Sequence, residues 1–213
     1  KREENTSTVT QRFIDAKELK LPIGFTAKIV GENLGPTRHI AVGKAGDVYV
    51  KLSKLKDGKG MYILKVPDGN GSLDKQTLFA NYPGTGVIIN GGYLYSSSNS
   101  GVFRYKLNEK DEIIDLESPE MIVSGLADHG RDNAKPLAMD GQGNLYVTIG
   151  SWSDDCRAAG SGQGMQPCTI LDSAGGIWKF KADQLGQEFK DGKRYATGLK
   201  NAVAIDWDMK SNA

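Results

Sequence analysis

Short apolar stretches alternate with glycine-containing turns along this chain, and one pattern recurs. Three segments combine a strand-like stretch, a turn and a second stretch: HIAVGKAGDVYVKL, GVIINGGYLYSSS and PLAMDGQGNLYVTIG. β-Branched and aromatic residues dominate the stretches, and Gly, Asn and Asp stand between them, as is typical of hairpin strands and tight turns. Each second stretch places an apolar residue directly before a tyrosine, at Tyr49, Tyr95 and Tyr146. The pattern predicts three β-hairpins.

Two further strands are expected after each hairpin. The first has a glycine two residues before an aromatic residue, in Gly60-Met61-Tyr62, Gly101-Val102-Phe103 and Gly176-Ile177-Trp178. The second is TLFANY, EMIVSGLA or KRYATGL. A unit of four short strands in roughly 45–50 residues has the size of a β-propeller blade. We therefore predict an all-β fold, a β-propeller of four-stranded blades. A β-sandwich is the alternative, but it does not predict the same four-strand pattern three times.

The repeat also sets the domain organisation. Residues 1–19 are polar at their start, and we interpret them as a flexible lead-in. Residues 20–213 form a partial propeller domain of about three and a half blades, because NAVAIDWDMKSNA opens a fourth unit. A propeller usually needs at least four blades to close. We expect the sequence to be the N-terminal half of a longer propeller.

Charge and hydropathy exclude some functions. The 27 Lys and Arg nearly balance the 26 Asp and Glu, which argues against a chain that binds nucleic acid. No stretch approaches the roughly 18 apolar residues of a membrane helix, so we expect no membrane span. The first residue is Lys1 rather than Met, which indicates that an export signal or a tag has been removed.

A Gly- and Ser-rich insertion at residues 151–175 interrupts the third unit and contains both cysteines, Cys156 and Cys168. Two sulfurs cannot complete a zinc site, whereas a disulfide suits an exported protein. Two reduced thiols are the alternative. Loops longer than about 12–15 residues are usually functional or disordered, and propeller ligands bind at one end of the channel. We expect a flap that shapes a substrate site, with a purely structural decoration as the alternative.

Three stretches resemble the glucose/sorbosone dehydrogenase family: LPIGFTAKIVGENLGPTRHIAVGKAGDVYV, LAMDGQGNLYVTIGS and RYATGLKNAVAIDWD. The resemblance covers about residues 20–213. It implies a six-bladed propeller that oxidises a sugar C1 hydroxyl or an aldehyde with pyrroloquinoline quinone (PQQ), held by calcium. Its partners would be a small sugar and an electron acceptor. Its location would be periplasmic or secreted, with a lipid anchor upstream of Lys1 as a further alternative.

The resemblance also points to catalytic residues. Such an oxidation needs a base near the hydroxyl proton and an acceptor for the hydride. The family's base is a histidine five residues before a leucine that matches Leu137, and Asp132 stands at that position. The nearest histidine is His129, three residues earlier, which we take as the tentative base; a solvated loop histidine is the alternative. Asp132 could serve only if burial raised its pKa.

In the family, an Arg-Asn or Lys-Asn pair faces the cofactor and the substrate. The resemblance places this pair at Lys200 and Asn201. Arg38, before the first inner strand, is a further candidate at the channel mouth. A surface lysine beside a turn asparagine is the alternative for the pair. The family's calcium and quinone ligands lie mainly past Ala213, so no metal ligand is assigned.

Two functions therefore remain. The first is an exported PQQ-dependent sugar dehydrogenase. The second is a non-catalytic propeller that binds a glycan or a partner protein through residues 151–175. Asp132 at the base position favours the second, and the intact crossover at 198–201 with the long loop favours the first.

Overall fold

The computed structural model describes residues 19–66, 73–157, 160 and 162–211. The lead-in expected at residues 1–19 lies outside them, except for Leu19. Nearly all regular structure in the described residues is β strand, with two short 3-10 helices, η2 (Thr169–Asp172) and η3 (Phe189–Asp191). No helix in this part of the chain is long and apolar enough to cross a membrane. The all-β prediction is confirmed.

The strands form three antiparallel blades, each in chain order from the inside outward. Blade one contains β1 (Thr37–Val42), β2 (Val48–Lys56), β3 (Lys59–Lys65) and β4 (Lys75–Phe79). Blade two contains β5 (Val87–Asn90), β6 (Tyr93–Ser97), β7 (Val102–Lys106) and β8 (Glu120–Ser124). Blade three contains β9 (Leu137–Met139), β10 (Asn144–Ile149), β11 (Gly176–Lys181) and β13 (Lys193–Thr197). All twelve strands were predicted from the repeat.

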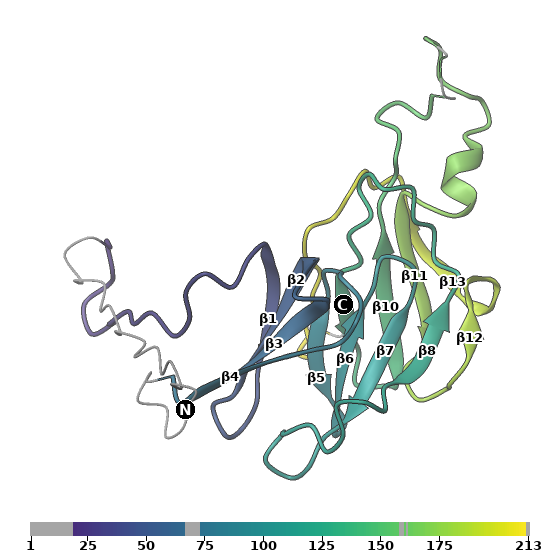
Figure 1. Ribbon diagram of the computed structural model, residues 1–213. Helices are drawn as coiled ribbons and strands as arrows, with labels where there is room; N and C mark the ends of the chain where they lie inside the picture. Colours follow the sequence, from purple (N-terminus) through teal and green to yellow (C-terminus); the bar gives the residue numbers. More distant parts are fainter. Residues whose placement is uncertain (1–18, 67–72, 158–159, 161, 212–213) are drawn as a thin grey trace, which may run out of the picture.

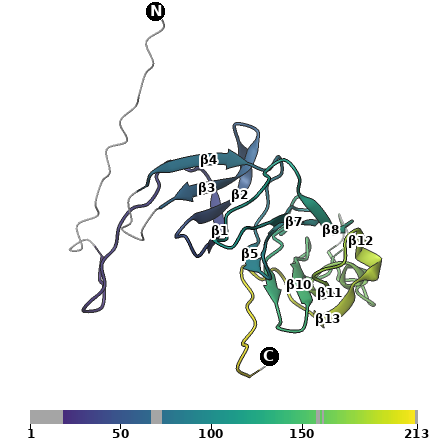
Figure 2. The same ribbon diagram turned by 90° about the horizontal axis from the view of Figure 1, so that it is seen from below.

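The blades follow one another in an arc around their inner strands (Figures 1 and 2). Strand β5 contacts both β1 and β9, so the inner strands are neighbours. Apolar side chains fill the space between blades: Trp178 and Val102 belong to one buried cluster, and Phe79 packs edge-on against Tyr105 with ring centroids 5.4 Å apart. The ring is not closed within the described residues, and six blades stays a prediction.

The repeated tyrosine joins neighbouring blades. The Tyr49 hydroxyl donates to the backbone oxygen of Asp111 in blade two, at 2.6 Å. The Tyr95 hydroxyl donates in the same way to Ala182 of blade three, at 3.0 Å. In blade three the Tyr146 hydroxyl instead donates to the Asp140 carboxylate at 3.0 Å. In blades one and two the tyrosine therefore satisfies its hydroxyl by binding the next blade.

The repeated glycine permits a close backbone approach. A Cβ built at Gly60, Gly101 or Gly176 would lie 1.9, 2.6 or 2.2 Å from a backbone oxygen of a neighbouring segment. Real Cβ atoms do not approach other atoms so closely. Each third strand therefore begins at a point where only glycine fits.

A thirteenth strand was not anticipated. Residues Gln187–Glu188 form β12, which pairs in parallel with β8 of blade two. The buried Gln187 amide donates to the backbone oxygens of Lys181 and Gln184, both at 2.8 Å, and its oxygen accepts from the Lys181 N–H at 3.0 Å. The loop between β11 and β13 thereby pairs with the outer edge of blade two, which would otherwise present unpaired backbone groups.

The half blade expected at the C-terminal end differs from the prediction. Residues 199–211 contain no strand, because no described segment offers a ladder of backbone partners. The segment instead lies against blade three, where the Trp207 ring stacks on Tyr146 with centroids 4.9 Å apart. It also reaches blade one, where His39 Nε2 lies 2.8 Å from the Val203 oxygen.

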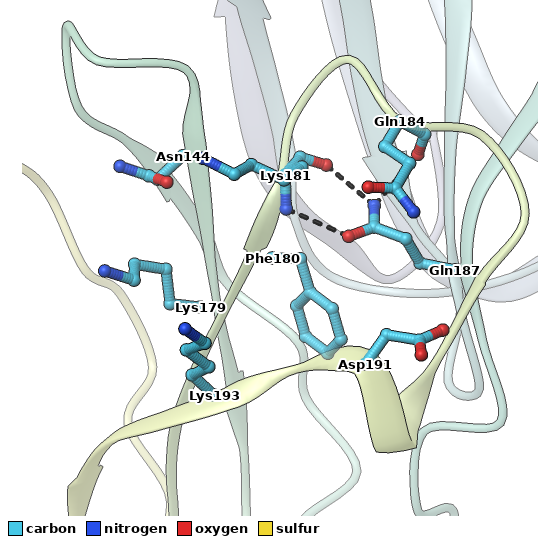
Figure 3. A pocket seen from close by; sticks show the side chains of 8 residues that line it. All are labelled: Asn144, Lys179, Phe180, Lys181, Gln184, Gln187, Asp191 and Lys193. Carbon is cyan, nitrogen blue, oxygen red and sulfur yellow. Dashed lines mark hydrogen bonds between the residues drawn. The ribbon is translucent and has the colours of Figure 1, made fainter.

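Lysines lie on the face of blade three that also carries Tyr146 (Figure 3). Lys179 in β11 stands opposite Lys193 in β13, and Lys181 stands opposite Asn144. They line a hollow of about 210 Å³. None of the three lysines forms an ion pair with another residue in the described ranges.

Candidate functional site

Two segments far apart in the sequence meet at the upper end of blade three, as oriented in Figure 1. One is the loop 127–135 between β8 and β9, and the other is the crossover 198–201 after β13. A Cβ on Gly150 would lie 2.1 Å from the Asp132 backbone oxygen and 2.6 Å from Asn201 Oδ1. Glycine at position 150 therefore lets the two segments close together. We call this meeting point, with the adjoining start of the loop 151–175, the mouth.

Lys200 holds the mouth together. Its ammonium group donates to a carboxylate oxygen of Asp132 and, at 2.5 Å, to the Ser151 backbone oxygen. It also lies 3.3 Å from Asp154 Oδ1. The second Asp132 oxygen accepts from the Asn201 amide at 3.3 Å. The structure thus brings three predicted site residues, Asp132, Lys200 and Asn201, into direct contact.

A second ion pair flanks this group. One guanidinium nitrogen of Arg131 donates to both oxygens of Asp154, at 2.8 and 3.0 Å. Hydrogen bonds from Arg131, and then from Lys200, lower the pKa of the exposed Asp154 carboxyl. The charges of Arg131, Lys200, Asp132 and Asp154 cancel.

His129 lies at the same mouth on an exposed stretch of the loop 127–135. Its ring centroid is 3.6 Å from that of Trp152, with the rings inclined by 39°. Neither imidazole nitrogen forms a hydrogen bond with a described residue. The neighbouring Asp128 carboxylate accepts from Gly130 N–H at 3.1 Å and from the Asn133 amide at 3.3 Å, which shapes the loop.

The loop 151–175, called the flap below, projects from the upper end of blade three in Figure 1 and is anchored at its base. Cys156 and Cys168 form a disulfide with Cα atoms 5.8 Å apart, as predicted. Both cysteines, Met165 and Trp152 pack against the buried cluster between blades two and three. The disulfide and these contacts fix the flap beside the mouth.

Arg38 is not part of this cluster. It lies exposed in β1, and its side chain makes no hydrogen bond or ion pair within the described ranges. The structure therefore does not join it to Lys200 and Asn201.

Sequence reasoning missed four members of the mouth. Arg131 directly precedes Asp132, and Trp152 and Asp154 belong to the predicted loop 151–175. Only the fold shows that Trp152 contacts His129 and that Asp154 lies beside Lys200. Lys135 is fully buried and donates to the Asn133 backbone oxygen at 2.9 Å. Burial lowers the pKa of Lys135 to about 8.

The residues present fit the quinone end of PQQ. The Asn201 amide keeps one N–H that Asp132 does not use, and the Lys200 ammonium places a positive charge beside it; both suit a quinone oxygen. Asn201 Oδ1 is buried with no hydrogen-bond partner among the described residues, and as an acceptor it suits a ligand hydroxyl rather than a quinone oxygen. The three carboxylates of PQQ need further cations, because the four charges at the mouth cancel. The described residues contain no group of three or more His, Cys, Asp or Glu side chains that could hold a metal ion.

Solved structures with the same fold include two AA12 carbohydrate-active enzyme structures from Trichoderma reesei. The calcium structure has a TM-score of 0.60 at 19% identity over 82% of this chain and 43% of that one. The iodide structure has a TM-score of 0.57 at 20% identity over 78% and 41%. The holo PQQ domain of pyranose dehydrogenase from Coprinopsis cinerea has a TM-score of 0.63 at 17% identity over 84% and 42%.

These likenesses confirm the propeller fold, and this chain spans about two fifths of each solved chain. No curated protein matches it. A family model described as TrAA12-like matches residues 19–213, which confirms the resemblance to quinone-dependent sugar dehydrogenases: the chain belongs to the TrAA12-like family.

Proposed function

We propose that this chain forms part of an exported, PQQ-dependent oxidoreductase that oxidises the C1 hydroxyl of a sugar, or a sugar aldehyde, at the mouth. The observation that carries the proposal is the meeting of the loop 127–135 with the crossover 198–201 in a TrAA12-like chain. The solved AA12 and pyranose dehydrogenase structures support a sugar substrate and PQQ, and one of them is a calcium structure. The disulfide supports an oxidising compartment.

His129 is the residue we assign as proton acceptor. A general base must reach the substrate hydroxyl by a hydrogen bond, directly or through one water. The His129 ring is exposed at the mouth, and neither of its nitrogens is engaged by another described residue. It therefore has a lone pair available to a sugar hydroxyl when the imidazole is neutral.

Asp132 has a different role in this proposal. Its two carboxylate oxygens accept from Lys200 and Asn201, so they are directed at groups of the chain itself. We assign Asp132 as a positioning residue that holds the Lys-Asn pair. When bound, PQQ supplies the electrophile that accepts the hydride. Asn201 would then orient a quinone oxygen with its remaining amide N–H, and the Lys200 ammonium would add a fixed positive charge beside it.

A non-catalytic propeller that binds a glycan or a partner protein is the second candidate. The engaged Asp132 at the family's base position and the neutral mouth favour it.

One experiment separates the two functions. The full-length protein is titrated with PQQ and calcium while the cofactor absorbance is followed, and aldoses are then added with an artificial electron acceptor. Saturable cofactor binding with sugar-dependent dye reduction supports the oxidoreductase. Sugar binding without cofactor binding or dye reduction would replace it with the recognition propeller.

A further inference from the structure

The flap contributes a second hollow next to the mouth. It has a volume of about 350 Å³, near the lower end of the roughly 300–1,000 Å³ usual for small-molecule sites. A ligand of one or two rings therefore matches it better than a long chain. Its lining consists of one aromatic side chain, one serine and two pairs of opposite charge: Trp152, Ser153, Arg131 with Asp154, and Arg157 with Asp155.

The charged groups are held in place. Arg157 lies 2.8 Å from Asp155 Oδ2, and its backbone N–H donates to the Ser153 hydroxyl at 2.7 Å. Residue 157 also pairs with Gly164 in an isolated β-bridge, and the adjacent Cys156 is disulfide-bonded. The polar groups are thus arranged before any ligand arrives, which reduces the entropy lost on binding.

The hollow is continuous with the mouth. Asp154 lines it and lies 3.3 Å from the Lys200 ammonium. Trp152 also lines it and contacts the His129 ring. A ligand in the hollow therefore lies beside the residues assigned to the oxidation.

The chemistry of the lining selects a neutral, hydroxyl-rich ligand. Two arginines and two aspartates leave no net charge, which disfavours a phosphorylated or acidic ligand. Carboxylates accept from hydroxyl groups and guanidinium groups donate to them, both through charge-assisted hydrogen bonds. The apolar body of a tryptophan suits the C–H face of a sugar ring.

We infer that this hollow is a second sugar subsite, which binds the neutral ring next to the one being oxidised. The substrate is then the reducing end of an oligosaccharide rather than a free monosaccharide. This inference rests on the proposed function, because it takes the mouth as the place of oxidation.

The test compares glucose with maltose and cellobiose on the full-length protein. Binding is measured by tryptophan fluorescence without cofactor, and kcat/KM is measured by dye reduction with PQQ and calcium. We expect at least one disaccharide to bind and to react about tenfold better than glucose, as one charge-assisted hydrogen bond would provide. Arg157→Leu should remove most of that preference without changing glucose turnover. Lys106→Leu, at the exposed end of β7 in blade two, is the control.

Equal binding and equal kcat/KM of the wild type for glucose, maltose and cellobiose would overturn the subsite. So would an unchanged disaccharide preference in a folded Arg157→Leu variant, with folding checked by its melting temperature. Disaccharide binding that depends on Arg157 without dye reduction for any sugar would support the subsite and refute the oxidation.

Discussion

At the scale of single residues, the mouth is organised by one ammonium group. Lys200 contacts Asp132, Asp154 and the Ser151 backbone. The family resemblance predicts that Asp132 stands where the family has a histidine and that Lys200 stands where the family has lysine or arginine. Because arginine and lysine differ in geometry, the residue at position 200 affects which side chain fits at position 132. The contact between Lys200 and Asp132 therefore explains both residues together.

Replacing Asp132 by Asn distinguishes a base from a positioning residue. The amide keeps the shape and one acceptor oxygen but loses the charge. We expect sugar-dependent dye reduction at saturating PQQ to fall by no more than about tenfold, because His129 remains. Loss of a general base typically costs about 10²–10⁴-fold. A loss in that range, with Asp183→Asn as an unaffected surface control, would assign the base to Asp132.

Lys51 provides a prediction about stability and pH. Its buried ammonium donates to the Tyr82 backbone oxygen at 2.9 Å, and burial lowers its pKa to about 7. Between pH 7 and about 10.5 the unfolded chain binds more protons at this site, so stability rises with pH there. Below pH 7 both states are protonated and the cost of burial is fully present.

The comparison with Lys51→Met isolates this effect. From pH 7 to pH 9 the free energy of unfolding of the wild type should rise by about 2 kcal/mol relative to the variant. Urea unfolding at the two pH values measures the difference. Parallel pH profiles of the two proteins would show that Lys51 keeps an ordinary titration in the folded state.

At the scale of elements, the strands were predictable because the information is local and repeated. Tyr49 and Gly60 mark positions that recur in each blade, and alternation with glycine-rich turns locates the strands. Strand β12 was not predictable, since its pairing with β8 depends on where the loop after β11 lies in space. The prediction of a strand near Val203 was also wrong, because a strand needs a hydrogen-bonding partner that the local sequence does not reveal.

The lysine face of blade three predicts a stabilising charge reversal. Lys179 and Lys193 stand directly opposite each other without an acidic partner in the described chain. Like charges at such positions are destabilising, and an opposite pair contributes roughly 0.2–1 kcal/mol. Lys193→Glu should therefore raise the free energy of unfolding by about 0.5 kcal/mol, and added salt should reduce the gain. Lys106→Glu serves as control, and an equal gain there would contradict the pairwise explanation.

We expect the disulfide to stabilise the flap strongly and to have little effect on the stability of the blades. Cys156 and Cys168 are 12 residues apart, and closing such a loop stabilises by roughly 2–3 kcal/mol in chain-entropy estimates. We expect trypsin to cleave after Arg157 much faster in a Cys156→Ser/Cys168→Ser variant, with fragments that stay associated under native conditions. Cleavage at the wild-type rate would mean that packing alone holds the flap.

At the scale of the whole molecule, three antiparallel blades follow one another in an arc around their inner strands. The chain is a TrAA12-like propeller segment, and it spans about two fifths of each solved structure reported above. The sequence placed Asp132, Lys200 and Asn201 in one site only through family resemblance. The fold adds Arg131, Trp152 and Asp154 to this site. It brings Arg131 and Asp154 within hydrogen-bond distance and places the Trp152 ring against His129. Pairings of this kind are tertiary, so no local pattern marks them.

The central claim is that His129 takes the proton while the Asp132–Lys200–Asn201 group orients the acceptor. The most direct measurement is the rate at which sugar reduces bound PQQ in a single turnover, compared between the wild-type full-length protein and His129→Gln. We predict that the variant binds PQQ and calcium with affinity within about twofold of wild type. Its reduction rate should fall by about 10²–10⁴-fold, the usual contribution of a general base. A His129→Gln variant that binds the cofactor and reacts at the wild-type rate would contradict the account.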